Sequence, residues 1–248
     1  MSDPTFRPDL YAGKAVLVVG GTSGIGAGIA AGFARCGAQV TITGATAAEA
    51  MRTADVADLT RCVAKVLDVR DDAAVVSLCA GLRELDVVVN CAGIIRRGAE
   101  HDPAVFAEVI DINLSGTLRV CGAARPLLAV RKGSIVNTAS MLSFFGAGLV
   151  PGYSASKGGI AQLTKSLAIA YAADGVRVNA IAPGWVATAL TQALQDDRER
   201  TAGIMARTPL ARWGTPEDIA GAVLFLCSPA AQFITGVILP VDGGYLVA

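Results

Sequence analysis

Short apolar runs alternate with longer amphipathic segments along this chain. The runs are β-branched or continuously apolar, as strands buried on both faces of a sheet are, and they span residues 15–19, 39–43, 63–67, 86–89, 134–138, 177–181 and 236–240. Helical patterns lie between them at residues 24–36, 72–82, 103–129, 153–173 and 216–226. Because alternation of strand and helix produces right-handed crossovers, the pattern predicts a doubly wound α/β fold, a seven-stranded parallel sheet with helices on both faces.

The length of 248 residues suits one large α/β domain, and no linker-like stretch divides it. We expect a single domain over residues 1–248, with an N-terminal extension at 1–12 and a segment at 185–210 that covers the substrate. In doubly wound sheets, ligands bind outside the carboxyl ends of the strands. The residues that follow each strand are therefore the candidates for function.

Composition narrows the range of partners. The chain is 53% hydrophobic and 17% charged with a formal net charge of zero, which provides no electrostatic footprint for nucleic acid or an anionic membrane. The apolar stretches are interrupted before they reach the ~18 residues of a membrane span, and residues 1–10 lack the apolar core of a secretion signal. We therefore expect a cytoplasmic protein with a small-molecule partner and no nucleic-acid or membrane partner.

Cysteine and histidine content limits the available chemistry. The six cysteines are scattered without close pairs, and we expect them to be reduced and buried. His101 is the only histidine, which leaves almost no material for a Ser-His triad or a histidine-rich metal site. No metal is predicted.

A glycine-rich turn joins the first predicted strand to the first predicted helix: Gly20-Gly21-Thr22-Ser23-Gly24-Ile25-Gly26. Such a turn lets the backbone approach a pyrophosphate, and the helix N-terminus offers free N–H groups and partial positive charge. With a strand before it and a helix after it, the motif indicates a dinucleotide more than a bare tight turn. Asp68-Val69 and Asn90-Cys91-Ala92-Gly93 close the third and fourth strands, where they would suit adenosine, although each alone is more often a turn.

Tyr153 and Lys157 stand four residues apart on a predicted helix and so lie on one face, one turn apart. A nearby ammonium favours phenolate over phenol, and it should draw a tyrosine pKa of ~10 toward working pH, where the group can act as acid or base. The same spacing occurs on many ordinary helices. The pair therefore indicates catalysis only if other residues support it.

Together these residues resemble the short-chain dehydrogenase/reductase family, and the resemblance covers nearly the whole chain. Gly20, Gly24 and Gly26 match the glycine turn of the family, and residues 90–93 match its Asn-Asn-Ala-Gly segment. The matches elsewhere are Asn113, Ser140, Tyr153 and Lys157 to the catalytic tetrad, Pro183-Gly184 with Thr188 to the nicotinamide-side loop, and Asp242-Gly243-Gly244 to the C-terminal signature. Gly20 and Cys91 depart from the usual threonine and asparagine, but neither touches the proton chemistry.

The resemblance implies a Rossmann-fold, NAD(P)-dependent oxidoreductase that transfers a hydride between nicotinamide and a secondary alcohol or ketone. Tyr153 would be the general base in oxidation, Lys157 would lower its pKa and bind the nicotinamide ribose, Ser140 would hold the substrate oxygen, and Asn113 would hold a water that links Lys157 to solvent. The cofactor contacts that motifs and resemblance together imply are Gly20, Thr22, Ser23, Gly24, Ile25, Gly26, Gly44, Ala45, Asp68, Val69, Asn90, Ala92, Gly93, Tyr153, Lys157, Pro183, Gly184, Val186 and Thr188.

The choice between NAD and NADP depends on the residues after the second strand, Thr43-Gly44-Ala45-Thr46. An acidic residue there would bind the ribose hydroxyls and repel a 2′-phosphate, whereas a basic one would attract it, and neither is present. Burying a dianionic phosphate without a cation costs more than losing one or two ribose hydrogen bonds. We favour NAD, with Arg52 as the residue that would supply positive charge if NADP were preferred.

Three segments resemble the family's dehydrogenases of 2-keto-3-deoxy sugar acids and gluconate: residues 91–97, 139–144 and 209–214. Arg96 and Arg97 follow the fourth strand, where a guanidinium could hold a carboxylate bidentately, although two solvated loop arginines are an equal alternative. The expected substrate contacts are Arg96, Arg97, Ser140, Met141, Phe144, Tyr153 and Trp185. The apolar members of this set could equally be packing residues or subunit contacts.

Three functions remain open. The first is NAD-dependent oxidation of a sugar-derived acid such as a 2-keto-3-deoxy aldonate. An NADPH-dependent 3-oxoacyl-[acyl-carrier-protein] reductase shares the tetrad, but the chain has no marked Lys/Arg cluster for an acidic carrier. A non-catalytic nucleotide-binding protein would not need an intact tetrad. The resemblance also implies a homotetramer built through residues 103–129 and 153–173 and the C-terminal strand.

Overall fold

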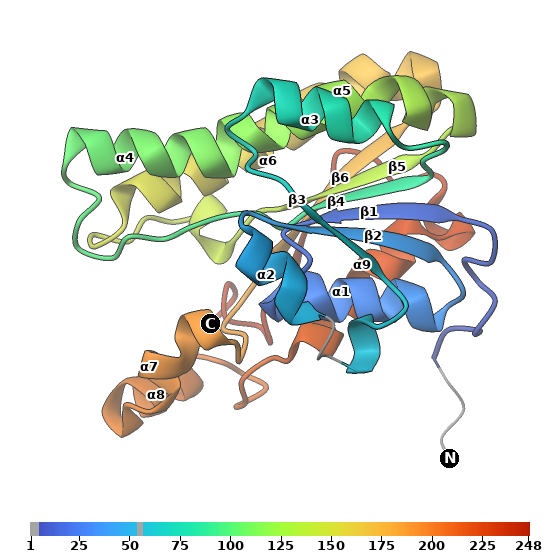
Figure 1. The fold of residues 1–248 in the computed structure, drawn as a ribbon. Coiled ribbons are helices and arrows are strands. Elements are labelled where there is room, and N and C mark those ends of the chain that lie inside the picture. The colour runs from blue at the N-terminus through green and yellow to red at the C-terminus, as the bar shows by residue number, and fades with distance from the viewer. Residues whose placement is uncertain (1–4, 54–56) are drawn as a thin grey trace.

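The computed structural model describes residues 5–53 and 57–248. In this part of the chain, seven strands form one parallel sheet with the order β3-β2-β1-β4-β5-β6-β7 (Figure 1). The strands are β1 (Ala15–Val19), β2 (Gln39–Gly44), β3 (Val63–Val66), β4 (Val87–Asn90), β5 (Ser134–Thr138), β6 (Arg177–Pro183) and β7 (Ile238–Val241). The predicted fold, a doubly wound Rossmann sheet, is confirmed.

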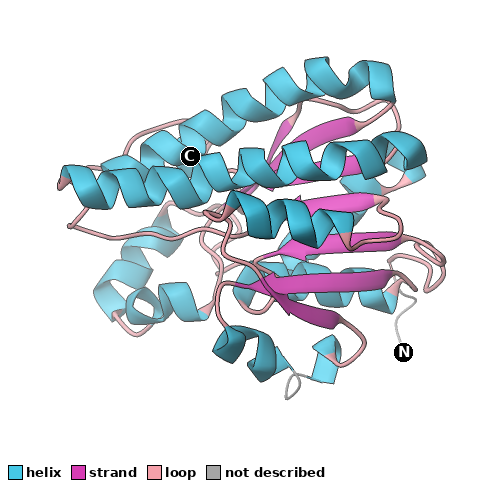
Figure 2. Cartoon of the chain, turned by 45° about the horizontal axis from the view of Figure 1, so that its top comes forward, coloured by secondary structure: helices cyan, strands magenta, loops and turns pink. Residues whose placement is uncertain are grey.

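Helices cover both faces of the sheet, as Figures 1 and 2 show. One face carries α1 (Gly24–Arg35), α2 (Ala47–Arg52) and α9 (Pro216–Cys227). The other carries α3 (Asp72–Ala80), α4 (Pro103–Ile110), α5 (Gly116–Arg131) and α6 (Pro151–Tyr171). The short helices α7 (Gln192–Gln195) and α8 (Arg198–Ala206) lie beyond the carboxyl ends of the strands.

The core explains why the central strands read as continuous apolar runs. Leu17, Val18 and Val88 have no solvent exposure because helices pack on both sides of β1 and β4. Phe33 belongs to the cluster under α1 and α9, and Leu128 to the cluster under α3, α5 and α6. The edge strand β3 is mostly exposed.

The helices differ from the prediction in two places. The predicted helix 103–129 is divided by a π-helical turn, Asp111–Ser115, between α4 and α5. The short helices α2 and α8 were not predicted as separate elements, because neither has a buried residue and neither produces an apolar stripe at helical spacing. Local capping and tertiary contacts therefore define them instead.

The sheet brings two loops together at the point where the strand order reverses. Val19 at the end of β1 pairs with Asn90 at the end of β4, and the N–H of Cys91 donates to the carbonyl of Val19 at 2.7 Å. The glycine turn and residues 91–93 thus form two sides of one crevice, which is where ligands bind in such sheets.

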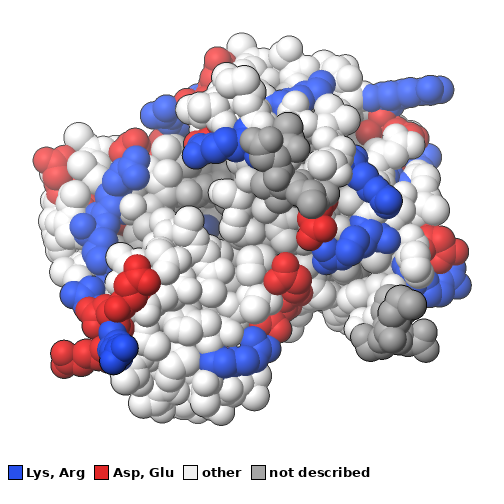
Figure 3. All heavy atoms as spheres, turned by 60° about the horizontal axis from the view of Figure 1, so that its bottom comes forward, with Lys and Arg blue, Asp and Glu red and all other residues white. Residues whose placement is uncertain are grey.

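Among the described residues no helix is long and apolar enough to cross a membrane. Figure 3 shows positive and negative side chains interspersed on a face that is hollowed near its centre.

Candidate active site

A cavity of about 390 Å³ extends along the carboxyl ends of the central strands from the glycine turn to Tyr153 and Lys157. The predicted cofactor contacts that line it are Gly20, Thr22, Ser23, Gly24, Ile25, Gly26, Gly44, Ala45, Asp68, Val69, Ala92, Gly93, Tyr153, Lys157 and Thr188. The four that do not are Asn90, Pro183, Gly184 and Val186. Asn90 points into the sheet, where its Nδ2 donates to Asn137 Oδ1 at 2.9 Å.

The glycine turn packs backbone directly against backbone, which is possible only because it lacks side chains. Gly20 has φ 76°, and a Cβ there would lie 2.5 Å from the backbone nitrogen of Ala92. A Cβ at Gly26 would overlap the carbonyl oxygen of Gly20. Ser23, the N-cap of α1, makes no side-chain hydrogen bond to the helix, so the helix N-terminus keeps N–H groups for an anion. The turn therefore fits a dinucleotide pyrophosphate.

A carboxylate lies at the adenosine end of the cavity, where none was expected. Glu49 on α2 lines the cavity, and its Oε2 accepts a hydrogen bond from the N–H of Ala45 at 2.7 Å. A Cβ at Gly44 would lie 2.7 Å from Cβ of Glu49, so this glycine lets α2 fold back over the end of β2. The sequence contained a signal for this arrangement, because Thr46 with Glu49 three residues later has the pattern of a capping box.

Asp68 is held in an ion pair at the same end of the cavity. The guanidinium of Arg70 contacts both carboxylate oxygens, with Nη2 to Oδ2 at 2.7 Å. Hydrogen bonds from Arg70 lower the pKa of Asp68. The adenosine side thus presents a neutralised pair, and Arg70 is a cavity residue that the sequence interpretation missed.

The catalytic end joins residues from two segments, the end of β5 with the turn that follows it and the start of α6. Tyr153 and Lys157 lie in the first turns of α6, with Lys157 Nζ 5.5 Å from the centroid of the Tyr153 ring. Ser140 follows β5 and lies close enough to the phenol to lower the pKa of Tyr153, and its Oγ accepts from the N–H of Leu142 at 3.2 Å. Lys157 is 4% exposed, and its ammonium donates to the carbonyl of Thr138 at 2.6 Å. The hydroxyl of Ser143 ties this group together by donating to the carbonyl of Lys157 at 2.6 Å.

Asn113 lies in the π-helical turn and holds the loop after β4. Its Oδ1 accepts from the N–H of Ile94 at 2.8 Å, and its Nδ2 donates to the carbonyl of Ile94 at 3.0 Å and to Ser156 Oγ at 3.1 Å. The amide is therefore fully engaged with the protein. Gly93 lies between Asn113 and Lys157. A Cβ placed on Gly93 would lie 3.2 Å from Asn113 Oδ1 and 3.9 Å from Lys157 Nζ.

The protonation of the pair differs from the expectation that Lys157 draws the tyrosine pKa down. Burial raises the pKa of Tyr153, a hydrogen bond from Ser140 lowers it, and the charge of Glu100 raises it further, so the net direction is upward. Burial also lowers the pKa of Lys157 to about 8. Desolvation is the largest cause of both shifts, because both groups are removed from water.

The predicted substrate contacts are only partly brought together. Arg96 is half exposed and pairs with Glu108 on α4 at 3.7 Å, and Arg97 is exposed. Met141 is buried beside Ser140, whereas the side chain of Phe144 is 53% exposed. None of these four lines the large cavity.

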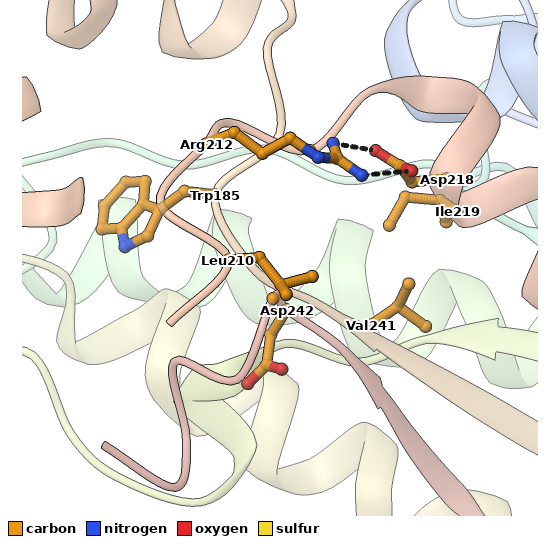
Figure 4. A pocket seen from close by; sticks show the side chains of 9 residues that line it. Trp185, Leu210, Arg212, Asp218, Ile219, Val241 and Asp242 are labelled. Atoms are coloured by element: carbon orange, nitrogen blue, oxygen red, sulfur yellow. Dashed lines mark hydrogen bonds and ion pairs between the residues drawn. The ribbon is translucent and has the colours of Figure 1, made fainter. Parts of the chain in front are cut away.

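Trp185 belongs to a second, smaller cavity. This cavity has a volume of about 160 Å³ and lies against β7 and the start of α9, as Figure 4 shows. Leu210, Ile219 and Val241 supply apolar surface, while Arg212 and Asp218 form an ion pair at 2.6 Å. The indole of Trp185 meets Trp213 and Tyr245 edge to face.

Comparison with known proteins agrees with the geometry. A family profile described as enoyl-(acyl carrier protein) reductase matches residues 19–246. A 2-dehydro-3-deoxy-D-gluconate 5-dehydrogenase from Pseudoalteromonas atlantica is 42% identical over 94% of this chain and 96% of its own length. A 5-keto-D-gluconate 5-reductase from Escherichia coli K12 is 38% identical over 97% of this chain and 99% of its own length. A solved structure from Agrobacterium tumefaciens, described as a 2-deoxy-D-gluconate 3-dehydrogenase with bound NADP, has a TM-score of 0.87 at 40% identity and covers 98% of this chain and 100% of that chain.

The chain belongs to the short-chain dehydrogenase/reductase family. It is an NAD(P)-dependent oxidoreductase of the kind that interconverts hydroxyl and keto groups, and the predictions of family and enzyme class are confirmed.

Proposed function

We propose that this enzyme is an NAD-dependent dehydrogenase of a sugar-derived acid such as a 2-keto-3-deoxy aldonate. The observation that carries the proposal is the near-full-length similarity to relatives named for gluconate-type acids. Tyr153 and Lys157 line the end of the large cavity opposite Glu49, and this arrangement supports the same chemistry.

Side chains of the protein carry out the proton transfer. Ser140 holds the substrate oxygen beside the phenol, and Tyr153 takes the hydroxyl proton in oxidation or returns it in reduction. Lys157 supplies positive charge to the phenolate that forms, and Asn113 holds the loop against which Lys157 packs. The bound dinucleotide supplies the hydride acceptor or donor.

The preference for NAD rests on Glu49. A carboxylate at the end of β2 can accept hydrogen bonds from ribose hydroxyls and repels a 2′-phosphate. Arg52, the residue that would have supplied positive charge, is exposed, and its Nε donates to the carbonyl of Ala48 at 3.2 Å. Arg70 is already paired with Asp68. The charges at this end of the cavity therefore disfavour NADP.

Substrate recognition is assigned to the segments next to the catalytic end. Arg96 and Arg97 lie on the loop between β4 and α4 and would bind the carboxylate of the substrate, with Arg96 exchanging Glu108 for it. Met141 and Phe144, which follow Ser140 in the chain, and Trp185 would supply apolar contacts to the substrate. Residues 185–210, which contain α7 and α8, form the cover that closes on substrate.

The assembly is proposed to be a cytoplasmic homotetramer. Leu118 on α5 and Ile169 on α6 are 47% and 80% exposed, and such side chains suit burial between subunits. Light scattering after gel filtration would measure the mass, and a monomer would contradict the proposal.

A substrate panel tests the function. Purified protein is assayed with NAD and NADP against 2-keto-3-deoxy acids, aldonates, simple secondary alcohols and 3-oxoacyl thioesters. We expect turnover of the sugar acids with NAD and little with the matching neutral polyols. Activity confined to thioesters with NADPH would overturn the proposal in favour of an acyl-carrier reductase.

A further inference from the structure

Glu100, on the loop between β4 and α4, is a buried carboxylate without a partner cation. Its exposure is 1%, and within residues 5–53 and 57–248 no Lys, Arg or His lies within ion-pair distance of it. The other buried carboxylate in that part of the chain, Asp86, is paired with Lys14 at 3.0 Å and with Arg131 at 3.0 Å. Burying a charge is costly unless other groups compensate for it, so the surroundings of Glu100 need an explanation.

Backbone N–H groups compensate for this charge. Oε1 accepts from the N–H of Arg96 at 2.7 Å, and Oε2 accepts from the N–H of Tyr153 at 2.7 Å. Tyr153 is the third residue of α6, so its N–H is one of those that a helix leaves without an internal partner. Val150, the N-cap residue, provides no side-chain cap. Glu100 caps the catalytic helix from a different segment of the chain, where the helix dipole favours negative charge.

Gly152 makes this contact possible. A Cβ at Gly152 would lie 3.3 Å from Glu100 Oε2 and 3.2 Å from the ring of Phe106. The absence of a side chain lets the carboxylate reach the helix, and the contact joins the loop that carries Arg96 to the turn that carries Tyr153.

Glu100 also places an unneutralised negative charge near the phenol. Around Tyr153, Ser140 approaches from the end of β5 and Lys157 from the next turn of α6. Cys91 at the end of β4 lies near Lys157, Glu108 on α4 is paired with Arg96, and Asp111 in the π-helical turn is paired with Arg119 at 2.8 Å. Glu100 is thus the carboxylate whose charge raises the pKa of Tyr153.

We propose that Glu100 is a positioning residue that clamps the first turn of α6 to the loop after β4 and so controls both the placement and the proton affinity of Tyr153. This proposal rests on the acid-base role of Tyr153 in the proposed function. A cap with a purely structural role would lower stability and turnover at every pH alike, whereas a charge that acts on the phenol changes the pH at which oxidation begins.

The main test is the pH profile of kcat/KM for oxidation in Glu100→Gln. Loss of the negative charge that raises the pKa of Tyr153 should move the rising limb to lower pH by about one unit. Glu100→Asp keeps the charge and should restore the wild-type position of that limb, with lower turnover because the side chain is shorter. Glu84→Gln, the same change at the other end of β4, should leave the profile unchanged. An unmoved limb in Glu100→Gln overturns the proposal.

A titration without substrate separates this proposal from the proposed function. The ultraviolet absorbance of phenolate in wild type minus that in Tyr153→Phe reports the ionisation of Tyr153, whatever the substrate is. We expect the pH midpoint of this ionisation to be lower in Glu100→Gln than in wild type and to be unchanged in Glu84→Gln. Equal midpoints in Glu100→Gln and wild type would contradict the role of Glu100 even if the enzyme turns over sugar acids.

If Glu100→Gln does not fold, substitutions of glycines on α6 test the proposal instead. Gly152→Ala crowds the carboxylate without removing it, while Gly158→Ala adds the same methyl group on the same helix where nothing lies within 4 Å. We expect turnover to fall several-fold in Gly152→Ala alone, with cofactor affinity unchanged, since small misplacements of a catalytic group are costly. Equal turnover in the two variants would refute the clamp.

Discussion

The two ends of the large cavity differ in the kind of atoms that form them. The cofactor end is shaped by backbone: Gly20, Gly24 and Gly26 bring main-chain atoms close to the ligand space and leave N–H groups free at the start of α1. The catalytic end is shaped by side chains that are buried, charged or hydrogen-bonded, with Tyr153 and Lys157 at its centre.

This difference indicates what each end can tolerate. The glycine turn depends on the absence of side-chain atoms, so adding a methyl group there should weaken cofactor binding, whereas changing a charge at this end should mainly alter the choice between NAD and NADP. A site built from buried polar side chains depends on electrostatic balance, so removal of one oxygen or one charge changes its chemistry while the fold persists. Four variants test this contrast, in order of decreasing effect.

Removal of one oxygen at the catalytic end should have the largest effect. Tyr153→Phe is expected to lower kcat at least ~100-fold while cofactor affinity is kept, because the proton-transfer group is lost and the cavity shape is not. Tyr171→Phe, at the end of the same helix, is the control and should keep near-normal kcat. Steady-state kinetics together with a binding titration of NAD measure both quantities, and near-normal turnover of Tyr153→Phe would show that the catalytic assignment is wrong.

Addition of one methyl group at the cofactor end comes next. In Gly26→Ala the new Cβ overlaps the Gly20 carbonyl oxygen, so the turn must move. Overpacking costs ~1–3 kcal/mol, which corresponds to a cofactor Kd raised ~10–100-fold. Calorimetric titration compares this variant with Gly122→Ala on α5, where nothing lies within 4 Å of the added atom. Equal affinities would mean that the turn does not hold the dinucleotide.

A change of charge at the cofactor end should alter specificity more than turnover. Glu49→Gln keeps an oxygen for the N–H of Ala45 but removes the negative charge, so the ratio of kcat/KM for NADP to that for NAD should rise about tenfold, the value of one charged hydrogen bond. Glu84→Gln serves as the control. A ratio that does not change would exclude Glu49 as the residue that selects NAD.

The smallest effect is the pH dependence of stability that Lys157 contributes. The pKa of Lys157 is lowered to about 8 in the folded state, so between pH ~8 and ~10.5 the unfolded chain binds more protons and stability rises with pH. Relative to Lys157→Met, the wild type should therefore gain about 1–2 kcal/mol of unfolding free energy from pH ~7 to ~9.5. Lys165→Met, exposed on the same helix, should show no such difference in urea melts. A parallel pH dependence in all three proteins would mean that Lys157 titrates normally.

Much of the fold could be predicted from the sequence because its determinants are local. The seven strands and the five main helical regions follow from apolar runs and from their alternation, and the glycine turn follows from one contiguous motif. The short helix α2 cannot be recognised from the hydrophobic pattern because it buries no residue. The position of Glu49 at the end of β2 therefore cannot be predicted either. The sequence favours NAD because no charged residue directly follows β2, whereas the structure brings the carboxylate of Glu49 to this point from α2.

The catalytic end shows the limit of prediction from sequence more clearly. The spacing of Tyr153 and Lys157 places them on one face of α6, but spacing carries no information about burial. Burial reverses the expected direction of the Tyr153 pKa. The position of Arg96 and Arg97 after β4 predicts a carboxylate site, but in the structure Arg96 pairs with Glu108 and Arg97 is exposed to solvent.

The sequence by itself determined the parallel sheet, the dinucleotide turn and the identity of the proton-transfer pair, because hydrophobic periodicity and glycine spacing act over a few residues. Only the tertiary structure decided which charges face those groups. Glu49 reaches the end of β2, Glu100 reaches the first turn of α6, and Arg70 neutralises Asp68 at the adenosine side. Electrostatic interactions depend on distance and burial in three dimensions, and neither can be known until the segments that carry the charges have packed together.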